Sequence, residues 1–180
     1  NKIPNKDRVY NSFRAYFTAN FSTNDTSILL EELLHFSLLY RTITKAKHSD
    51  LKVSELLKRL IRMEMSVTYP FLLEVFNDNY KGLLSIEDLS SILIILETYI
   101  LRRFMCDVPT NALNKVFMTL SRDIKKYPEY EQKYLDVFTY ILLSKKAANR
   151  FPKDDEFREK LFEKDIYNLK AKNKVFFLER

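Results

Sequence analysis

Arg102 and Arg103 stand side by side after a long apolar stretch, and they are the residues of this sequence best suited to bind an anion. An arginine fork matches the oxygens of a phosphate or a carboxylate with two parallel hydrogen bonds. Asn111, Asn114 and Lys115 follow at the start of the next expected helix, where free backbone N–H groups also favour anions. We expect these five residues to contact DNA phosphates or a neighbouring domain. The structural alternative is that the two arginines cap the helix end and form an ion pair.

A second candidate pair is Arg41 and His48, which are separated by six residues. This spacing resembles the Arg-to-His motif of HEPN ribonucleases, which are also helical bundles. Thr42, directly after the arginine, is a weak match to the polar residue of that motif. His48 is also expected near the end of a helix, where histidine is common for structural reasons. A ribonuclease is therefore the least favoured of the alternatives.

The residue types give little support to other catalytic chemistry. One cysteine, Cys106, and two histidines, His35 and His48, are too few for most metal centres, and no base is placed beside a nucleophile. Carboxylates gather at expected helix starts, where the helix dipole explains them. A carboxylate-based metal nuclease would need two of these clusters to meet in the fold. We expect no catalytic residue, no metal and no cofactor on this chain.

The residues NDNYKGLLSIED resemble a calcium-binding loop if Gly82 takes the sharp turn. Asn77 and Asn79 would then be the first ligands and Asp88 the last, although a lysine stands where another oxygen ligand belongs. The same residues also describe two helix ends. Gly82 would end one helix, and Ser85 would cap the next. We prefer the interpretation as helix ends.

Glycine content and apolar periodicity indicate an all-α fold. The chain has 1 glycine among 180 residues, too few for tight hairpins or phosphate-binding loops. We expect a single domain, residues 1–180, forming one bundle of roughly eight helices. Its buried centre should be a helix near 86–105, where apolar residues occupy every face. Glu97 is the only charged residue between Leu89 and Leu101.

Several helix starts can be predicted from capping residues. Thr110 or Asn111 should cap the helix that follows the central one. Pro128 should open the next helix, because its fixed φ suits a first helical position. Asp154 or Asp155 should cap the helix after that.

The two ends of the chain carry further expectations. The first helix should end near Asn20 and present one apolar face, made of Val9, Phe13, Tyr16 and Phe17. Another helix should start at about Ala171. Because the sequence begins without methionine and stops inside an apolar helical pattern, we expect a piece of a longer protein.

Charge and hydropathy indicate the partners and the cellular compartment of the protein. A net charge of +6, from 30 basic and 24 acidic residues, permits contact with nucleic acid without requiring it. No apolar run approaches the roughly 18 residues of a membrane span, and no signal peptide is recognised. A single cysteine suits a reducing compartment. We therefore expect a cytoplasmic protein with no membrane partner.

Four blocks of the sequence resemble the helical region of GmrSD-type restriction proteins. They are YILRRFMCDVPTNALNKVF, RFPKDDEF, DIYN and the closing VFFLER. Looser matches, VYNSFRAYF, PFLLEVF and GLLSIEDL, precede them in the same order. Proteins of this bacterial family join an N-terminal ParB-like nucleotide-hydrolysing domain to a C-terminal HNH nuclease domain, and they cut modified foreign DNA such as phage DNA. Asp107 stands where a small residue would be expected.

The resemblance implies a place in an architecture rather than a catalytic role. Both the Asp-Gly-Gln-Gln-Arg block of the N-terminal domain and the His-centred HNH motif are absent from this chain. We therefore expect a non-catalytic helical module that spaces and couples those two domains. Its partners would be the flanking catalytic domains, with double-stranded DNA as a further partner. The alternative is an independent module that binds a protein through a basic or aromatic groove.

Overall fold

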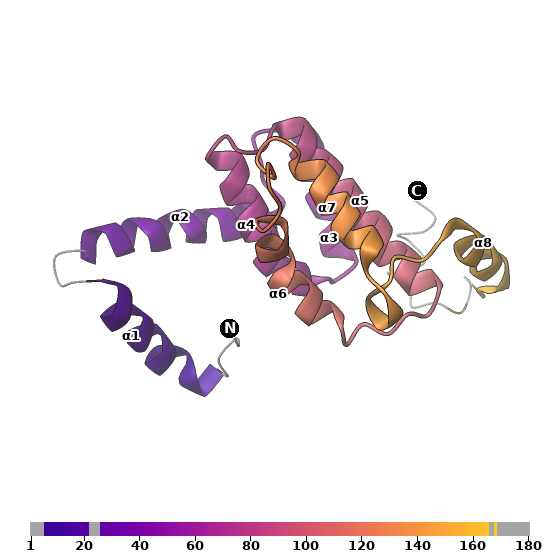
Figure 1. Cartoon of the computed structure of the whole chain (residues 1–180), viewed down its shortest axis with the longest axis horizontal. Helices are drawn as coiled ribbons and strands as arrows, with labels where there is room; N and C mark the ends of the chain where they lie inside the picture. Colours follow the sequence, from indigo (N-terminus) through magenta and orange to yellow (C-terminus); the bar gives the residue numbers. More distant parts are fainter. Residues whose placement is uncertain (1–5, 22–25, 166–167, 169–180) are drawn as a thin grey trace. The chain divides into compact units, whose positions relative to one another are not determined.

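The computed structural model describes residues 6–21, 26–165 and 168, and these residues form helices and no strand. The predicted all-α class is confirmed (Figure 1). The α-helices are α1 (Val9–Asn20), α2 (Thr26–Lys45), α3 (Leu51–Arg62), α4 (Tyr69–Tyr80), α5 (Ile86–Met105), α6 (Leu113–Ile124), α7 (Tyr134–Ser144) and α8 (Asp154–Glu163). Short 3-10 helices lie at Lys6–Arg8, Ser66–Thr68 and Ala147–Asn149. The helix expected from about Ala171 lies outside the described residues.

The chain divides into two compact units, Asn1–Leu38 and Leu39–Arg180, and each is described separately. The single domain expected from the chain length stays a prediction. None of the helices in the described ranges is long and apolar enough to cross a membrane.

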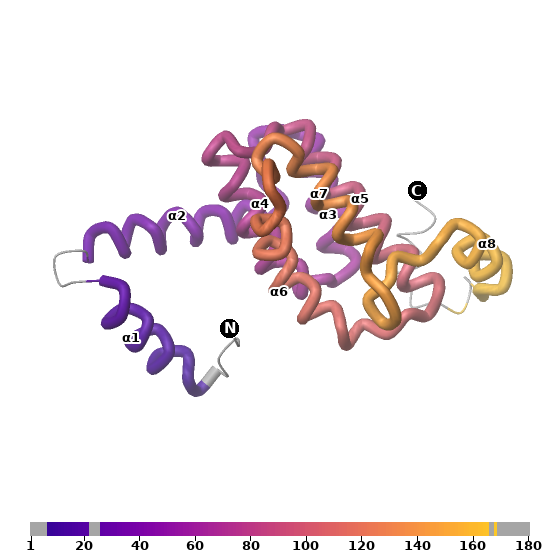
Figure 2. Tube along the Cα trace, in the orientation of Figure 1, coloured from indigo at the N-terminus to yellow at the C-terminus, as the bar shows by residue number. Residues whose placement is uncertain are grey.

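The second unit is built around α5, as the sequence predicted. This helix packs against α3, α4, α7 and α8, and the tube in Figure 2 shows α7 running beside it. It buries Leu89, Ile92, Leu93, Leu96 and Ile100, but not every face as expected: the stripe Glu87, Ser91, Ile94, Thr98 and Arg102 is exposed or half-buried. Its start is also as predicted, because the Ser85 hydroxyl accepts a hydrogen bond of 3.0 Å from the N–H of Asp88.

Gly82 ends α4 in the way that the helix-end interpretation predicts. Its φ is +75°, in the left-handed region that glycine adopts without strain. Two hydrogen bonds close the Schellman motif: the N–H of Leu83 to the carbonyl of Asp78 and the N–H of Gly82 to that of Asn79, each 3.0 Å. The Asn79 side chain donates to the carbonyl of Leu84 at 2.7 Å. These contacts account for the segment as a junction between α4 and α5.

Other junctions use left-handed residues that are not glycine. Ala46, Glu64, Asp107, Glu129 and Ala147 have φ values of 49°, 54°, 51°, 58° and 50°. Asp107 follows α5 and forms the same motif as Gly82, with the N–H of Val108 bonded to the carbonyl of Arg103 at 2.9 Å. A small residue was expected at position 107. Aspartate serves because it tolerates the left-handed region better than most residues do.

The predicted starts of three helices, α6, α7 and α8, are wrong. Pro128 does not open α7, which begins at Tyr134, because the left-handed Glu129 cannot continue a helix and the segment forms turns instead. Neither Thr110 nor Asn111 caps α6: the N-cap is Ala112, already in a helical conformation.

At α8, the aspartates predicted as caps lie at the first two helical positions, Asp154 and Asp155, and Lys153 occupies the N-cap without a side-chain hydrogen bond. Acidic groups still favour the positive end of the helix dipole there.

One buried ion pair joins the centre of α5 to α3. The carboxylate of Glu97, 1% exposed, receives 2.8 Å contacts from Nε and Nη2 of Arg59. The guanidinium reaches it from a position that is 36% exposed. Two parallel contacts of this kind are the strongest arrangement for an arginine and a carboxylate.

A second polar cluster joins α4 to α6 and α7. The buried carboxylate of Asp78 accepts hydrogen bonds from Lys125 Nζ at 3.2 Å and from the Tyr134 hydroxyl at 3.1 Å. Lys125 also contacts Glu74 at 3.1 Å. Burial lowers the pKa of Lys125, but the hydrogen bonds and charges of Glu74 and Asp78 outweigh it and raise the pKa overall. Burial and the charge of Asp78 raise the pKa of Tyr134.

This cluster predicts a loss of stability at alkaline pH. Lys125 and Tyr134 have raised pKa values in the folded state, so the unfolded chain loses these protons first. Their contribution is complete below the unfolded pKa values of about 10 and is lost as the pH rises through the folded values. We expect Tyr134→Phe to flatten the fall in the free energy of unfolding above pH of about 10. Urea unfolding at several pH values measures this, and an unchanged slope would assign the fall to other groups.

The first unit contains α1 and the first part of α2. The apolar face expected on α1 is largely exposed: Val9, Phe13 and Tyr16 are exposed, Phe17 is half-buried, and no residue of the helix is fully buried. The end of α1 at Asn20 is as predicted. In α2, the residues before Leu39 include the buried Leu29 and the exposed Leu30, Leu33, Leu34 and Leu38.

Candidate functional site

Arg103 lies inside the second unit at the end of α5, with a relative exposure of 1%. Its Nη2 donates to the carbonyl of Pro109 at 2.6 Å, and its Nη1 donates to the carbonyl of Arg150 at 3.2 Å and to the Tyr99 hydroxyl at 3.4 Å. Burial lowers the pKa of this guanidinium, and the neighbouring Tyr99 acts in the opposite direction. Arg103 thus ties the end of α5 to the turn that follows it and to the distant backbone at Arg150.

Tyr99 completes this cluster from one turn earlier in α5. Its ring lies 5.2 Å from the Arg103 guanidinium carbon, and its hydroxyl donates to the carbonyl of Asn149 at 2.7 Å. Burial raises the pKa of Tyr99, and Arg103 opposes that rise. Arg103 Nε and Asn149 Oδ1 are buried without a hydrogen-bond partner among the described residues. The cluster is therefore closed to solvent and made mainly of carbonyl acceptors.

Arg102 points to a different part of the same C-terminal stretch. Its guanidinium carbon lies 5.7 Å from the centre of the Phe151 ring and 5.2 Å from that of Phe157, distances typical of cation–π contacts. Its Nη1 donates to the carbonyl of Pro152 at 3.1 Å and pairs with a carboxylate oxygen of Asp154 at 2.5 Å. The side chain is 23% exposed. Both arginines therefore hold residues 149–157 against α5.

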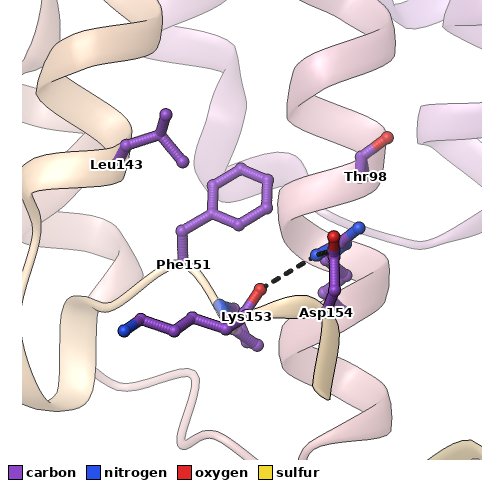
Figure 3. Close-up of a pocket in the computed structure, with 7 residues that line it drawn as sticks. Thr98, Leu143, Phe151, Lys153 and Asp154 are labelled. Carbon is purple, nitrogen blue, oxygen red and sulfur yellow. Dashed lines mark hydrogen bonds and ion pairs between the residues drawn. The ribbon is translucent and has the colours of Figure 1, made fainter. Parts of the chain in front are cut away.

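A pocket of about 560 Å³ opens beside Arg102. It is lined by Thr98 and Arg102 of α5, Leu143 of α7 and the segment Phe151, Pro152, Lys153 and Asp154. Figure 3 shows the Phe151 ring projecting between Leu143 and Thr98. The lining combines an apolar wall with two cations and one carboxylate. Within this lining, Arg102 is already paired with Asp154.

The remaining predicted site residues lie elsewhere. Asn111, Asn114 and Lys115 are exposed around the start of α6, and none of them lines the pocket. The link to the arginines runs through the backbone, because Arg103 bonds the carbonyl of Pro109. The structure therefore brings Arg102 and Arg103 together with residues 149–157, and not with the three residues at the start of α6.

Several residues of the site could not be found by the sequence analysis. Phe157 and the ion pair between Arg150 and Glu156 carry the attachment onward from the cluster to α8. Lys164 adds an ion pair to Asp107 and lies 5.6 Å from the Phe104 ring centre. The RFPKDDEF block was noted in the sequence, but its contact with α5 depends on the path of the chain over about fifty intervening residues.

His48, of the candidate ribonuclease pair, is engaged in the junction between α2 and α3. Its Nδ1 accepts a hydrogen bond of 3.0 Å from the backbone N–H of Asp50, and the backbone N–H of His48 donates to the Ser54 hydroxyl at 2.9 Å. The ring packs edge-on against Phe76, with the two ring centres 5.9 Å apart. Arg41 lies exposed on α2. These contacts give His48 a structural role.

No group of three or more histidine, cysteine, aspartate or glutamate side chains gathers to hold a metal ion in the described part of the chain.

Comparison with known proteins adds no relative. No family model, no curated protein and no solved structure matches this chain. The resemblance to the helical region of the restriction proteins stays a prediction.

Proposed function

We propose that this chain is a non-catalytic helical module of a bacterial phage-defence protein of the restriction type. In this proposal it spaces and couples a nucleotide-hydrolysing domain and an HNH nuclease domain, which are its partners. The observation that carries the proposal is the use of Arg102 and Arg103 to fasten residues 149–157 to the end of α5. The four sequence blocks support it as well, because the two arginines and the Phe-Pro-x-Asp segment belong to those blocks.

The fastening suits a coupling role for a mechanical reason. Arg103 bonds the backbone carbonyl of Pro109, just after α5, and that of Arg150, much later in the chain, so a displacement of either stretch disturbs the other. Arg102 and the Arg150–Glu156 ion pair extend the same attachment to α8. A domain joined after α8 would therefore be held to the bundle by more than a flexible connection. In this proposal the exposed Asn111, Asn114 and Lys115 add contacts to DNA phosphates without reading sequence.

Restriction of phage by the full-length protein tests the proposal. We expect Arg102→Ala combined with Arg103→Ala to reduce restriction strongly, measured as the efficiency of phage plating. Leu142→Ala is the matched control, because it removes a fully buried side chain of α7 outside the attachment and should cost a comparable 2–5 kcal/mol or so. If the double arginine variant and Leu142→Ala both lost restriction, the arginines would be needed only for folding. Cleavage of DNA or hydrolysis of nucleotide by the isolated chain would contradict the proposal.

A second candidate function is an independent module that binds another protein. The exposed apolar side chains of α1, α2 and α8 favour it, and Phe162 of α8 is 90% exposed. Binding to duplex DNA separates the two candidates. Phosphate contacts release counterions and weaken as the salt concentration rises, whereas an apolar protein contact does not.

A further inference from the structure

The first unit exposes an apolar row on α1. Val9, Phe13 and Tyr16 follow one another at helical spacing and are 51%, 40% and 52% exposed. We call these three residues the α1 face. At about 1.5 Å per residue, the row is roughly 10 Å long.

The first part of α2 exposes a row of nearly the same length. Leu30, Leu34 and Leu38 recur every fourth residue and are 59%, 60% and 52% exposed. We call these three residues the α2 face. Leucines normally lie in a core, and two helices with this much exposed apolar surface indicate a contact that the described residues of the first unit do not supply among themselves.

The charges beside the two faces have opposite signs. Lys6, Asp7, Arg8 and Arg14 are the charged residues between positions 6 and 21, three basic and one acidic, which gives a net charge of +2. Glu31 and Glu32 are the acidic residues between positions 26 and 38, where no lysine or arginine occurs. Arg14, Glu31 and Glu32 form no ion pair with another described residue. An α1 face and an α2 face would therefore attract each other by charge as well as by apolar burial.

We propose that two copies of this chain associate through their first units, with the α1 face of each copy packed against the α2 face of the other. A second copy is the occupant that meets both requirements at once, because a two-fold contact uses both faces twice and places basic beside acidic residues at each. Arg14 of one copy then lies near Glu31 of the other. This inference goes beyond the coupling role and does not depend on it.

Sedimentation equilibrium of the 180-residue chain tests the proposal. We expect a dimer that Leu34→Glu abolishes, because the variant buries a carboxylate in each of the two symmetric contacts. Phe162→Glu is the matched control, since Phe162 is the most exposed large apolar residue outside the first unit. It should leave the dimer unchanged. Circular dichroism should show the same helix content in all variants, as these positions are on the surface.

A charge exchange identifies the two faces as partners. Arg14→Glu and Glu31→Lys should each raise the dimer dissociation constant by about tenfold, because each variant replaces attraction with repulsion in both symmetric contacts. Combining them should restore the original constant. A chain that stays monomeric overturns the proposal, and so does a dimer indifferent to Leu34→Glu. Failure of the combined variant to recover would show that these two faces do not meet. None of these results would alter the restriction experiment on the attachment at α5.

Discussion

Arg103→Met should lower the free energy of unfolding of the second unit by about 3 kcal/mol, because it removes the hydrogen bonds of a buried guanidinium to two carbonyls and the longer one to the Tyr99 hydroxyl. The carbonyls of Pro109 and Arg150 would lose their donors inside the protein. Methionine fills much of the same volume, which limits the cost of an empty space. Removing Nε should not lower the free energy of unfolding, since this buried group has no hydrogen-bond partner among the described residues.

Urea unfolding followed by circular dichroism measures this effect. Arg103→Lys should recover little of the loss, because an ammonium cannot span both carbonyls with a planar fork. Arg102→Ala is the neighbouring control and should cost about 1 kcal/mol, since its ion pair with Asp154 lies at the surface. Equal effects at positions 102 and 103 would contradict the assignment of Arg103 as the main attachment.

Arg59→Met should have an effect of similar size, about 3 kcal/mol, because it leaves the carboxylate of Glu97 buried without its guanidinium. The lower end of the usual range applies, because Arg59 itself is 36% exposed and water can reach its position. The loss should appear in the same urea experiment.

A double variant separates the value of this ion pair from the cost of breaking it. Arg59→Met combined with Glu97→Leu should regain most of the stability lost in Arg59→Met alone, because well-packed apolar residues often replace a buried pair without penalty. Lys58→Met, one residue away on the exposed side of α3, should produce no measurable change. If the double variant were less stable than the single one, packing space around Glu97 rather than its charge would be decisive.

The sequence predicted those parts of the fold that depend on local pattern. The bounds of α5 follow from apolar periodicity and from Ser85, a cap that acts over three residues. Gly82 as a helix end follows in the same way. The start of α7 could not be predicted, because Glu129 adopts a backbone conformation that its type disfavours. A residue that violates a local preference leaves no local signal.

The candidate site was predicted only in part for a related reason. Arg102 and Arg103 stood out because of their charge after an apolar helix. Arg102 forms an ion pair with Asp154, as the structural alternative predicts, but the carbonyls that the two side chains bond lie outside α5. Their partners at 149–157 are tertiary, and no spacing rule connects them to α5. The grouping with Asn111, Asn114 and Lys115 rested on closeness in sequence. Helix α6 instead leaves those three residues at the surface.

The non-glycine residues at the ends of these helices have a consequence for engineering the protein. A common route to a more stable variant is to replace glycine and so restrict the unfolded chain. Here that route is closed, because Gly82 needs its positive φ. Glycine introduced at Glu129 would relieve a left-handed backbone conformation that costs an L-residue about 1–2 kcal/mol, and this exceeds the roughly 0.4–1 kcal/mol that glycine costs by freeing the unfolded chain. In this chain with 1 glycine, the free energy of unfolding can therefore be raised at the junctions between helices.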